Sequence, residues 1–125
     1  MYTYYTKEGK FETYVYSNIP FNKLNRKNGP AVEHNISGNK EWWVDGKRHR
    51  SDDPAIEYKN GSKEWYKFGK RHRLNGPAIE YKNGSRYWYI NGKKLNKKEV
   101  ETWIKNNNIN LKTKEHQVLF MVMFG

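Results

Sequence analysis

A sixteen-residue segment that occurs twice, with three changes, constrains the fold of this chain more than any other feature. Residues 46–61 read GKRHRSDDPAIEYKNG and residues 69–84 read GKRHRLNGPAIEYKNG. Trp42, Trp65 and Trp88 stand 23 residues apart. A unit this short needs a neighbour to bury its apolar face, so such units stack in a row. The sequence therefore predicts three consecutive repeats over residues 21–93, within a single domain that spans residues 1–125.

Each repeat has the pattern of a β-hairpin. A short run of alternating β-forming residues precedes Asn60-Gly61, the dipeptide that best accepts the positive φ angles of a tight turn. An aromatic strand then returns, and a two-residue turn would place Ile56 opposite Trp65 and Ile79 opposite Trp88. The expected fold class is mainly β, built from consecutive antiparallel β-hairpin repeats of about 23 residues with a short C-terminal helix and terminal segment.

The two ends of the array depart from the repeat. Residues 1–20 predict an N-terminal capping hairpin with strands at Tyr2–Thr6 and Phe11–Tyr16. Residues 94–125 are expected to form a helical cap and tail, because the stretch from Asn96 to Glu99 resembles a capping box and predicts a short helix near residues 97–106. After Thr113, the segment VLFMVMF favours a helical turn followed by a strand, with one continuous helix as the alternative.

Composition and charge narrow the class of partner. The formal net charge is +11 and the pI is about 9.7, a surplus that favours an acidic partner. The absence of cysteine excludes disulfides, thiol nucleophiles and zinc sites of the cysteine type. No stretch approaches the roughly 18 apolar residues of a membrane span, and residues 1–10 lack the apolar core of a signal peptide. These features predict a cytoplasmic protein.

The junctions between repeats are the first candidates for ligand binding. Both copies of the segment contain Arg-His-Arg, and we predict ligand contacts from Arg48, His49, Arg71 and His72. Arginine offers a planar fork of donors to phosphate or carboxylate, and histidine can add a further donor. A structural role, in which the histidines hold the turns, stays open as the alternative.

A second arginine of the junction has a different interpretation. Arg26, Arg50 and Arg73 occupy the same position in all three junctions. A residue that every repeat keeps is usually one that every repeat needs to fold, so we predict that these arginines are structural. The recurrent glutamates at positions 33, 57 and 80, or loop carbonyl groups, are their expected partners.

The aromatic strands divide into two faces. Trp42, Trp65 and Trp88 are predicted to lie in the core. The neighbouring residues point to the other face, which is open to solvent or a partner, and they are interleaved with Lys and Arg as in surfaces that stack nucleic-acid bases. The stacking residues predicted on this ground are Trp43, Tyr66 and Tyr89.

The sequence offers little catalytic machinery. The four histidines lack the spacing of metal ligands, and two of them recur at the repeat interval instead. No Gly-rich phosphate loop precedes a helix, and no nucleophile motif is present. We therefore expect a protein that is not an enzyme and that uses no cofactor or metal.

The pattern W-x-x-x-G-K-x-x-R-x-x-G-P-A over residues 21–93 resembles the MORN-like β-hairpin repeats that are frequent in proteins of phages and giant viruses. The resemblance implies rows of antiparallel hairpins. It also implies a viral or phage protein that acts in the cytoplasm of the host cell, including a role in countering a host defence.

The combined prediction is a basic, non-enzymatic binding protein whose ligand is anionic, either a nucleic acid or a nucleotide. One alternative is an interaction module or inhibitor that binds an acidic host protein. Another is a self-assembling structural repeat, in which open hairpin edges pair between chains.

Overall fold

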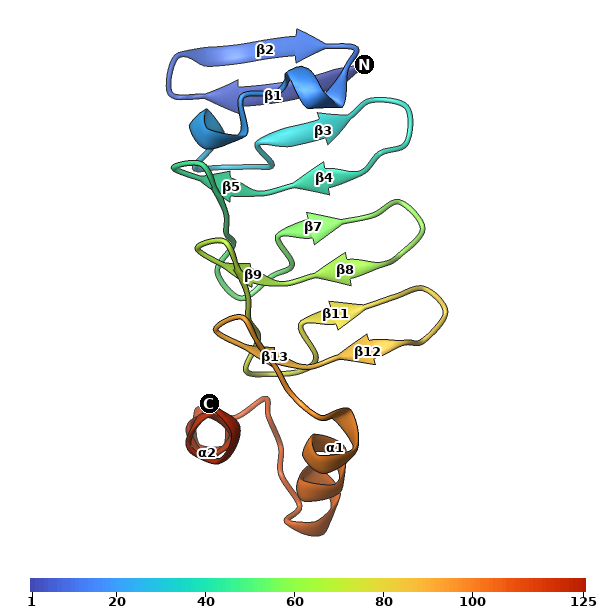
Figure 1. Cartoon of the computed structure of the whole chain (residues 1–125), viewed down its shortest axis with the longest axis vertical. Helices are drawn as coiled ribbons and strands as arrows, with labels where there is room; N and C mark the ends of the chain where they lie inside the picture. Colours follow the sequence, from blue (N-terminus) through green and yellow to red (C-terminus); the bar gives the residue numbers. More distant parts are fainter.

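The computed structural model describes residues 1–125 as a row of stacked hairpins closed by two helices (Figure 1). The N-terminal hairpin consists of β1 (Tyr2–Thr6) and β2 (Gly9–Thr13), followed by the short 3-10 turns η1 (Tyr16–Asn18) and η2 (Phe21–Lys23). The first repeat contains β3 (Val32–His34), β4 (Lys40–Glu41), β5 (Trp43–Val44) and β6 (Lys47–Arg48). The second contains β7 (Ile56–Glu57), β8 (Lys63–Glu64), β9 (Tyr66–Lys67) and β10 (Lys70–Arg71). The third contains β11 (Ile79–Glu80), β12 (Arg86–Tyr87), β13 (Tyr89–Ile90) and β14 (Lys93–Lys94).

The hairpins join into one antiparallel sheet. Its eight strands follow the order β12-β11-β8-β7-β4-β3-β1-β2, so each repeat adds one hairpin to the row. Each repeat also makes a second, smaller hairpin that lies outside this sheet, on the side of the array away from the loop that joins the two sheet strands of the repeat (Figure 1). These small hairpins consist of β5 and β6, β9 and β10, or β13 and β14. The predicted class, mainly β with consecutive antiparallel hairpins and a C-terminal helix, is confirmed.

The predicted pairing within the repeats is wrong by one residue. Ile56 lies opposite Glu64, not Trp65, and Ile79 lies opposite Tyr87, not Trp88. The reason is the loop, because Gly61 adopts a φ of +97° and donates its N–H to the carbonyl of the residue three positions earlier. A turn followed by a glycine in this conformation gives a three-residue loop with a bulge rather than a two-residue turn.

The observed register sorts the side chains of the sheet onto two faces. On the outer face, acidic and basic residues alternate from strand to strand. In order, these are Glu33, Lys40, Glu57, Lys63, Glu80 and Arg86. Opposite charges directly across an antiparallel pair stabilise it, so this face is neutralised by its own neighbours. On the inner face, buried aliphatic residues alternate with Glu41 and Glu64, of which Glu64 is only 6% exposed.

Two helices close the C-terminal end of the array. The helix α1 (Lys97–Asn106) has the predicted bounds, and the side chain of Asn96 accepts the N–H of Glu99 at its start. Residues 114–124 form a second helix, α2 (Lys114–Phe124), so the continuous-helix alternative is correct and the strand is not. Its Phe120 is fully buried against Trp88 of the last repeat, with the ring centroids 5.7 Å apart. This tertiary contact outweighs the β-preference of the tail.

The small hairpins outside the sheet all turn through positive φ. The central pairs are Asp45-Gly46, Phe68-Gly69 and Asn91-Gly92, and each has φ above zero at both residues, as a type I′ turn requires. At Gly46 a side chain is also excluded by space, because a Cβ atom would lie 2.4 Å from the backbone oxygen of Asn22. No helix in the structure has the length and apolar character that a membrane span would need.

Candidate nucleic-acid interface

The recurrent arginine of each junction holds two repeats together. Arg73 stacks on the ring of Trp65 in the preceding repeat, with its guanidinium carbon 3.7 Å from the ring centroid. The same guanidinium donates to the Pro77 carbonyl at 3.0 Å and to Glu80 at 2.9 Å. Arg50 and Arg26 make the equivalent contacts. The predicted structural role of these arginines is thus visible in all three junctions.

The two junction histidines support the turn of the following repeat. The Nδ1 atom of His49 accepts the N–H of Phe68 at 3.1 Å, and that of His72 accepts the N–H of Asn91 at 2.9 Å. In the first junction the side-chain oxygen of Asn25 does the same. Burial, and then the charge of Lys67, lower the pKa of both histidines. Near neutral pH they are therefore neutral acceptors, and Nδ1 offers no donor to a ligand.

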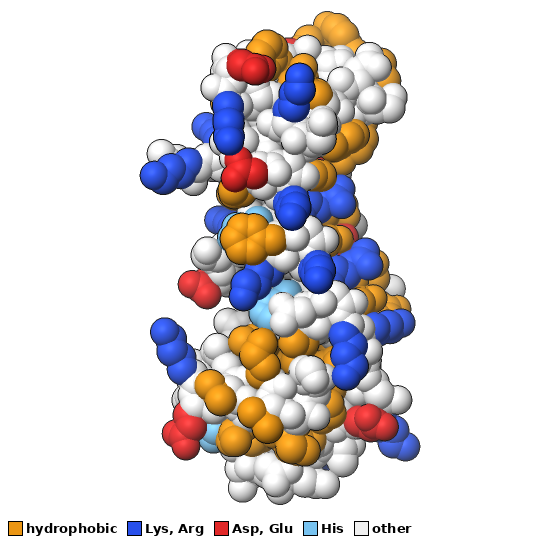
Figure 2. Space-filling model, turned by 60° about the vertical axis from the view of Figure 1, so that its left-hand side comes forward, with side chains coloured by type: hydrophobic (Ala, Val, Ile, Leu, Met, Phe, Trp, Pro, Cys, Tyr) orange, Lys and Arg blue, Asp and Glu red, His pale blue; other side chains and the backbone are white.

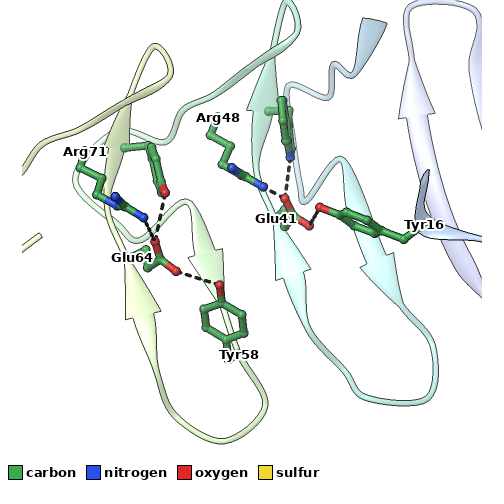
Figure 3. Close-up of polar contacts among 8 residues, drawn as sticks. Tyr16, Glu41, Arg48, Tyr58, Glu64 and Arg71 are labelled. Atoms are coloured by element: carbon green, nitrogen blue, oxygen red, sulfur yellow. Dashed lines mark hydrogen bonds and ion pairs between the residues drawn. The ribbon is translucent and has the colours of Figure 1, made fainter. Parts of the chain in front are cut away.

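The other junction arginines contact two carboxylates, one largely buried and one fully buried (Figure 3). Glu41 accepts hydrogen bonds from the hydroxyl of Tyr16 at 2.7 Å, from the indole of Trp43 at 3.1 Å and from Arg48 at 3.2 Å. Burial, and then the Glu41 carboxylate, raise the pKa of the Tyr16 hydroxyl, which keeps it protonated as a donor. Burial alone would lower the pKa of Arg48, but Glu41 reverses this and keeps the guanidinium charged.

The next repeat contains the same arrangement around Glu64. This carboxylate accepts from the hydroxyls of Tyr58 and Tyr66, at 2.7 and 3.0 Å, and forms an ion pair with Arg71 at 3.5 Å. Buried carboxylates are tolerated only when such donors replace the lost water. Arg48 and Arg71 are therefore held by the fold, although their side chains remain 32% and 41% exposed.

Five of the predicted binding residues form a single column of alternating rings and guanidinium groups. Its order is Trp43, Arg48, Tyr66, Arg71 and Tyr89, with distances from arginine to ring centroid of 4.8 to 5.8 Å. The expectation that these rings lie on an open face is wrong for Trp43 and Tyr66, which are 7% and 8% exposed. The strand is interrupted at Trp42, and the regular alternation used for the prediction does not continue across that break.

Lysine, and not arginine, supplies the unpaired positive charge. Every arginine of the chain lies within 4.0 Å of a carboxylate. Among the lysines only Lys7 does so, with Asp45 at 3.0 Å. The surplus of +11 is therefore carried by lysine side chains that have no carboxylate within 4.0 Å.

Several of these lysines follow the edge of the small hairpins, which we call the basic turn row. Its members are the lysines Lys47, Lys67, Lys70 and Lys93, together with Phe68, which lies between them. Successive turns touch, because the Cβ of Lys47 lies 3.7 Å from the Cβ position of Gly69, and that of Lys70 lies 3.6 Å from the Cβ position of Gly92. With two strands per repeat, neighbouring turns are roughly 10 Å apart. Figure 2 shows basic side chains following one another along this side of the molecule.

The central hairpin of the row breaks two local rules. Lys67 lies directly opposite Lys70, where the other hairpins have Val44 opposite Lys47 and Ile90 opposite Lys93. Like charges at directly opposed positions destabilise a strand pair. This departure costs stability, and it adds a positive charge to an exposed edge.

Phe68 is the second departure. It has a φ of +45° at a turn position where the other hairpins have aspartate and asparagine, the residues that tolerate this conformation. The ring stacks on His49, with centroids 3.9 Å apart and planes 13° apart, and it remains 54% exposed. Backbone strain retained at one residue points to function when it presents that residue to solvent. One face of the ring is thus supported by His49, and the side chain stands between lysines.

A shallow cavity of about 250 Å³ lies beside the row, between two junction loops. His49, Lys67, His72 and Trp65 are among its lining residues. The indole N–H of Trp65 is buried and has no hydrogen-bond partner, whereas that of Trp88 donates to Glu101. The volume is below the roughly 300–1,000 Å³ of pockets that enclose a whole small ligand. The cavity therefore suits one group of a larger ligand that lies along the surface.

The sequence reasoning overlooked Phe68 and treated the lysines only as part of the basic junctions. A comparison of the three turns, VDGK, KFGK and INGK, carries the missing signal, because only the central turn has lysine and phenylalanine in its first two places. The likeness to MORN-like repeats is a likeness of motif. No protein-family model, curated protein or solved structure matches this chain.

Proposed function

We propose that this protein binds a single-stranded nucleic acid along the basic turn row, without catalysis. The observation that carries the proposal is Phe68. Its backbone is strained, its aromatic ring is exposed, and it lies among lysines that have no carboxylate partner. Surfaces that bind single strands combine a track of positive charge with aromatic rings on which bases stack. The basic turn row has both parts.

The exposed face of Phe68 favours a strand with unpaired bases. Bases in a duplex are already stacked on one another, whereas those of a single strand are free to stack on a side chain. Neighbouring turns are roughly 10 Å apart, so an extended strand can meet lysines of successive repeats. The small volume of the adjacent cavity favours this ligand over an enclosed nucleotide.

Salt-dependent binding of a labelled single-stranded oligonucleotide tests the proposal. For single strands, the logarithm of the binding constant falls with the logarithm of salt concentration by about 0.7 per phosphate neutralised. The triple variant Lys47→Gln, Lys67→Gln, Lys70→Gln should therefore reduce this slope by about 2. Fluorescence anisotropy between 50 and 200 mM salt covers the range in which such contacts change affinity most.

A matched triple provides the control. Lys98→Gln, Lys105→Gln and Lys112→Gln remove the same charge from exposed lysines in the C-terminal cap. This variant should keep the slope of the natural protein. Equal losses in both triples would show that net charge alone attracts the probe, and failure to bind at 50 mM salt would contradict the proposal outright.

A further inference from the structure

One edge of the eight-stranded sheet is open. The strand β2 is the outermost strand in Figure 1, and it pairs only with β1. At the other end of the sheet, the edge strand β12 is followed by helix α1, and Arg86 of β12 donates to Glu101 of that helix (Figure 1). An unpaired edge strand presents a row of backbone donors and acceptors that another strand can use. The question is which strand fits this edge.

The hydrogen bonds of β1 reveal which backbone groups of β2 point to the open edge of the sheet. Tyr5 donates its N–H to the carbonyl of Ala31, and its own carbonyl accepts the N–H of Asn25, both on the repeat side of β1. The backbone N–H and C=O groups of successive residues in a strand point alternately to its two sides. Those of Tyr4 therefore point toward β2, and those of its partner Phe11 point back toward β1. The backbone groups of Lys10 and Glu12 therefore point to the open edge.

These outward groups restrict how two copies of β2 can meet. An antiparallel pair around a two-fold axis can be centred on Lys10, Phe11 or Glu12. The first register places Lys10 opposite itself and the last places Glu12 opposite itself, and like charges at directly opposed positions are unfavourable. The register centred on Phe11 places each Lys10 opposite Glu12 of the second copy. We propose that the protein forms a symmetric dimer through β2 in this register.

The side chains of the proposed pair continue the pattern of the sheet. Glu12 lies opposite Thr3, which in turn lies opposite Glu33, so Lys10 and Glu12 belong to the outer face with its alternating charges. Phe11 is 39% exposed and stacks on Tyr4 with centroids 5.5 Å apart. In the proposed register it meets its own copy at a pair without hydrogen bonds, where opposed side chains come closest. The dimer buries this ring, and its formation does not depend on nucleic-acid binding.

Single cysteines provide a test, because the chain contains none. In the dimer the two Phe11 Cα atoms should be about 4.5 Å apart, which is within the range that a disulfide bridges. The two Thr13 positions should be separated by about 14 Å along the strands, which is out of range. Under mild oxidation, Phe11→Cys should give a covalent dimer of the 15.0 kDa chain at least tenfold faster than Thr13→Cys, and equal rates would overturn the register.

Charge exchange tests the pairing without a covalent bond. In sedimentation experiments the natural protein should be dimeric, whereas Lys10→Glu and Glu12→Lys should each be monomeric with unchanged melting temperatures. An equimolar mixture of the two variants should recover the dimer, because each chain then meets opposite charges on the other. A natural protein that remains at 15.0 kDa up to 1 mM, or variants that remain dimeric alone, would overturn the proposal.

Discussion

The substitution Phe68→Asn separates the effect of the central turn on stability from its proposed role in binding nucleic acid. The position has a φ of +45°, and the equivalent position of the third repeat is Asn91, with a φ of +48°. Asparagine adopts this conformation readily, whereas a residue such as phenylalanine pays about 1–2 kcal/mol for it. The backbone N–H would still reach Nδ1 of His49, because that hydrogen bond does not involve the side chain of residue 68.

Two opposing contributions set the expected change in stability. Relief of the strained turn contributes about 1–2 kcal/mol in favour of the variant. Loss of the stacked contact between Phe68 and His49 removes about 0.5–1.5 kcal/mol, the usual range for an aromatic pair. The free energy of unfolding of Phe68→Asn, measured by urea denaturation, should therefore lie between about 0.5 kcal/mol below and about 1.5 kcal/mol above that of the natural protein.

Binding should change in the opposite direction. A base stacked on an aromatic side chain contributes about 1–3 kcal/mol, which corresponds to a loss of about 5- to 150-fold in affinity when the ring is removed. Fluorescence anisotropy with a labelled single-stranded oligonucleotide measures this loss. The slope of affinity against salt should be unchanged, because no lysine is altered.

Tyr14→Asn is the matched control, since Tyr14 is 78% exposed and follows the end of β2 that lies away from its turn. Its removal should leave affinity unchanged. If Phe68→Asn binds the oligonucleotide as tightly as the natural protein, the ring has no stacking role. If the variant instead unfolds more easily by more than about 1 kcal/mol, Phe68 serves the fold and the strain argument fails.

Two further predictions concern the junctions. Arg73→Met should lower the free energy of unfolding by about 3 kcal/mol, the sum of its stacked, hydrogen-bonded and ionic contacts, and the melting temperature by about 11 °C. Thermal denaturation should show a smaller loss for Arg26→Met, because the ion pair of Arg26 is longer and its arginine side chain is more exposed than that of Arg73. Because folding lowers the pKa of His49 and His72, the unfolded chain binds more protons, and stability should fall as the pH drops from about 6.5 toward 5. Urea denaturation at both pH values should show a smaller fall for His72→Asn, which keeps an acceptor and removes one titrating group.

The sequence was sufficient to predict the features that each repeat determines locally. The 23-residue interval, the Asn-Gly loops and the capping residue Asn96 predicted hairpins and the helix at residues 97–106, and the structure contains them. The recurrence of Arg26, Arg50 and Arg73 predicted their structural role. These signals are reliable because a turn, a helix cap or a repeated contact depends on neighbouring residues in one unit or in the next.

The candidate site was predicted less well, for reasons that lie in tertiary contacts. Arg48 and Arg71 have the residue type of anion ligands, but Glu41 and Glu64 reach them only after the strands pair in the observed register. That register differs by one residue from the prediction, and a shift of one residue moves every side chain to the other face. Trp43 was misplaced for a second reason: the strand breaks at Trp42, so the alternation that predicted an open face for Trp43 does not continue, and the residue is buried.

By itself, the sequence determined that this chain is a basic row of hairpins with modified ends, because periodicity and turn chemistry act over short distances. The tertiary structure decided which charges remain free. It pairs every arginine with a carboxylate, neutralises the outer face strand by strand, and leaves the lysines and Phe68 of the turn edge exposed. It also decided that the tail is a helix, since Phe120 is buried against Trp88 only when the end of the array is in place. Net charge belongs to the sequence, but its distribution over a surface depends on which side chains the fold brings together.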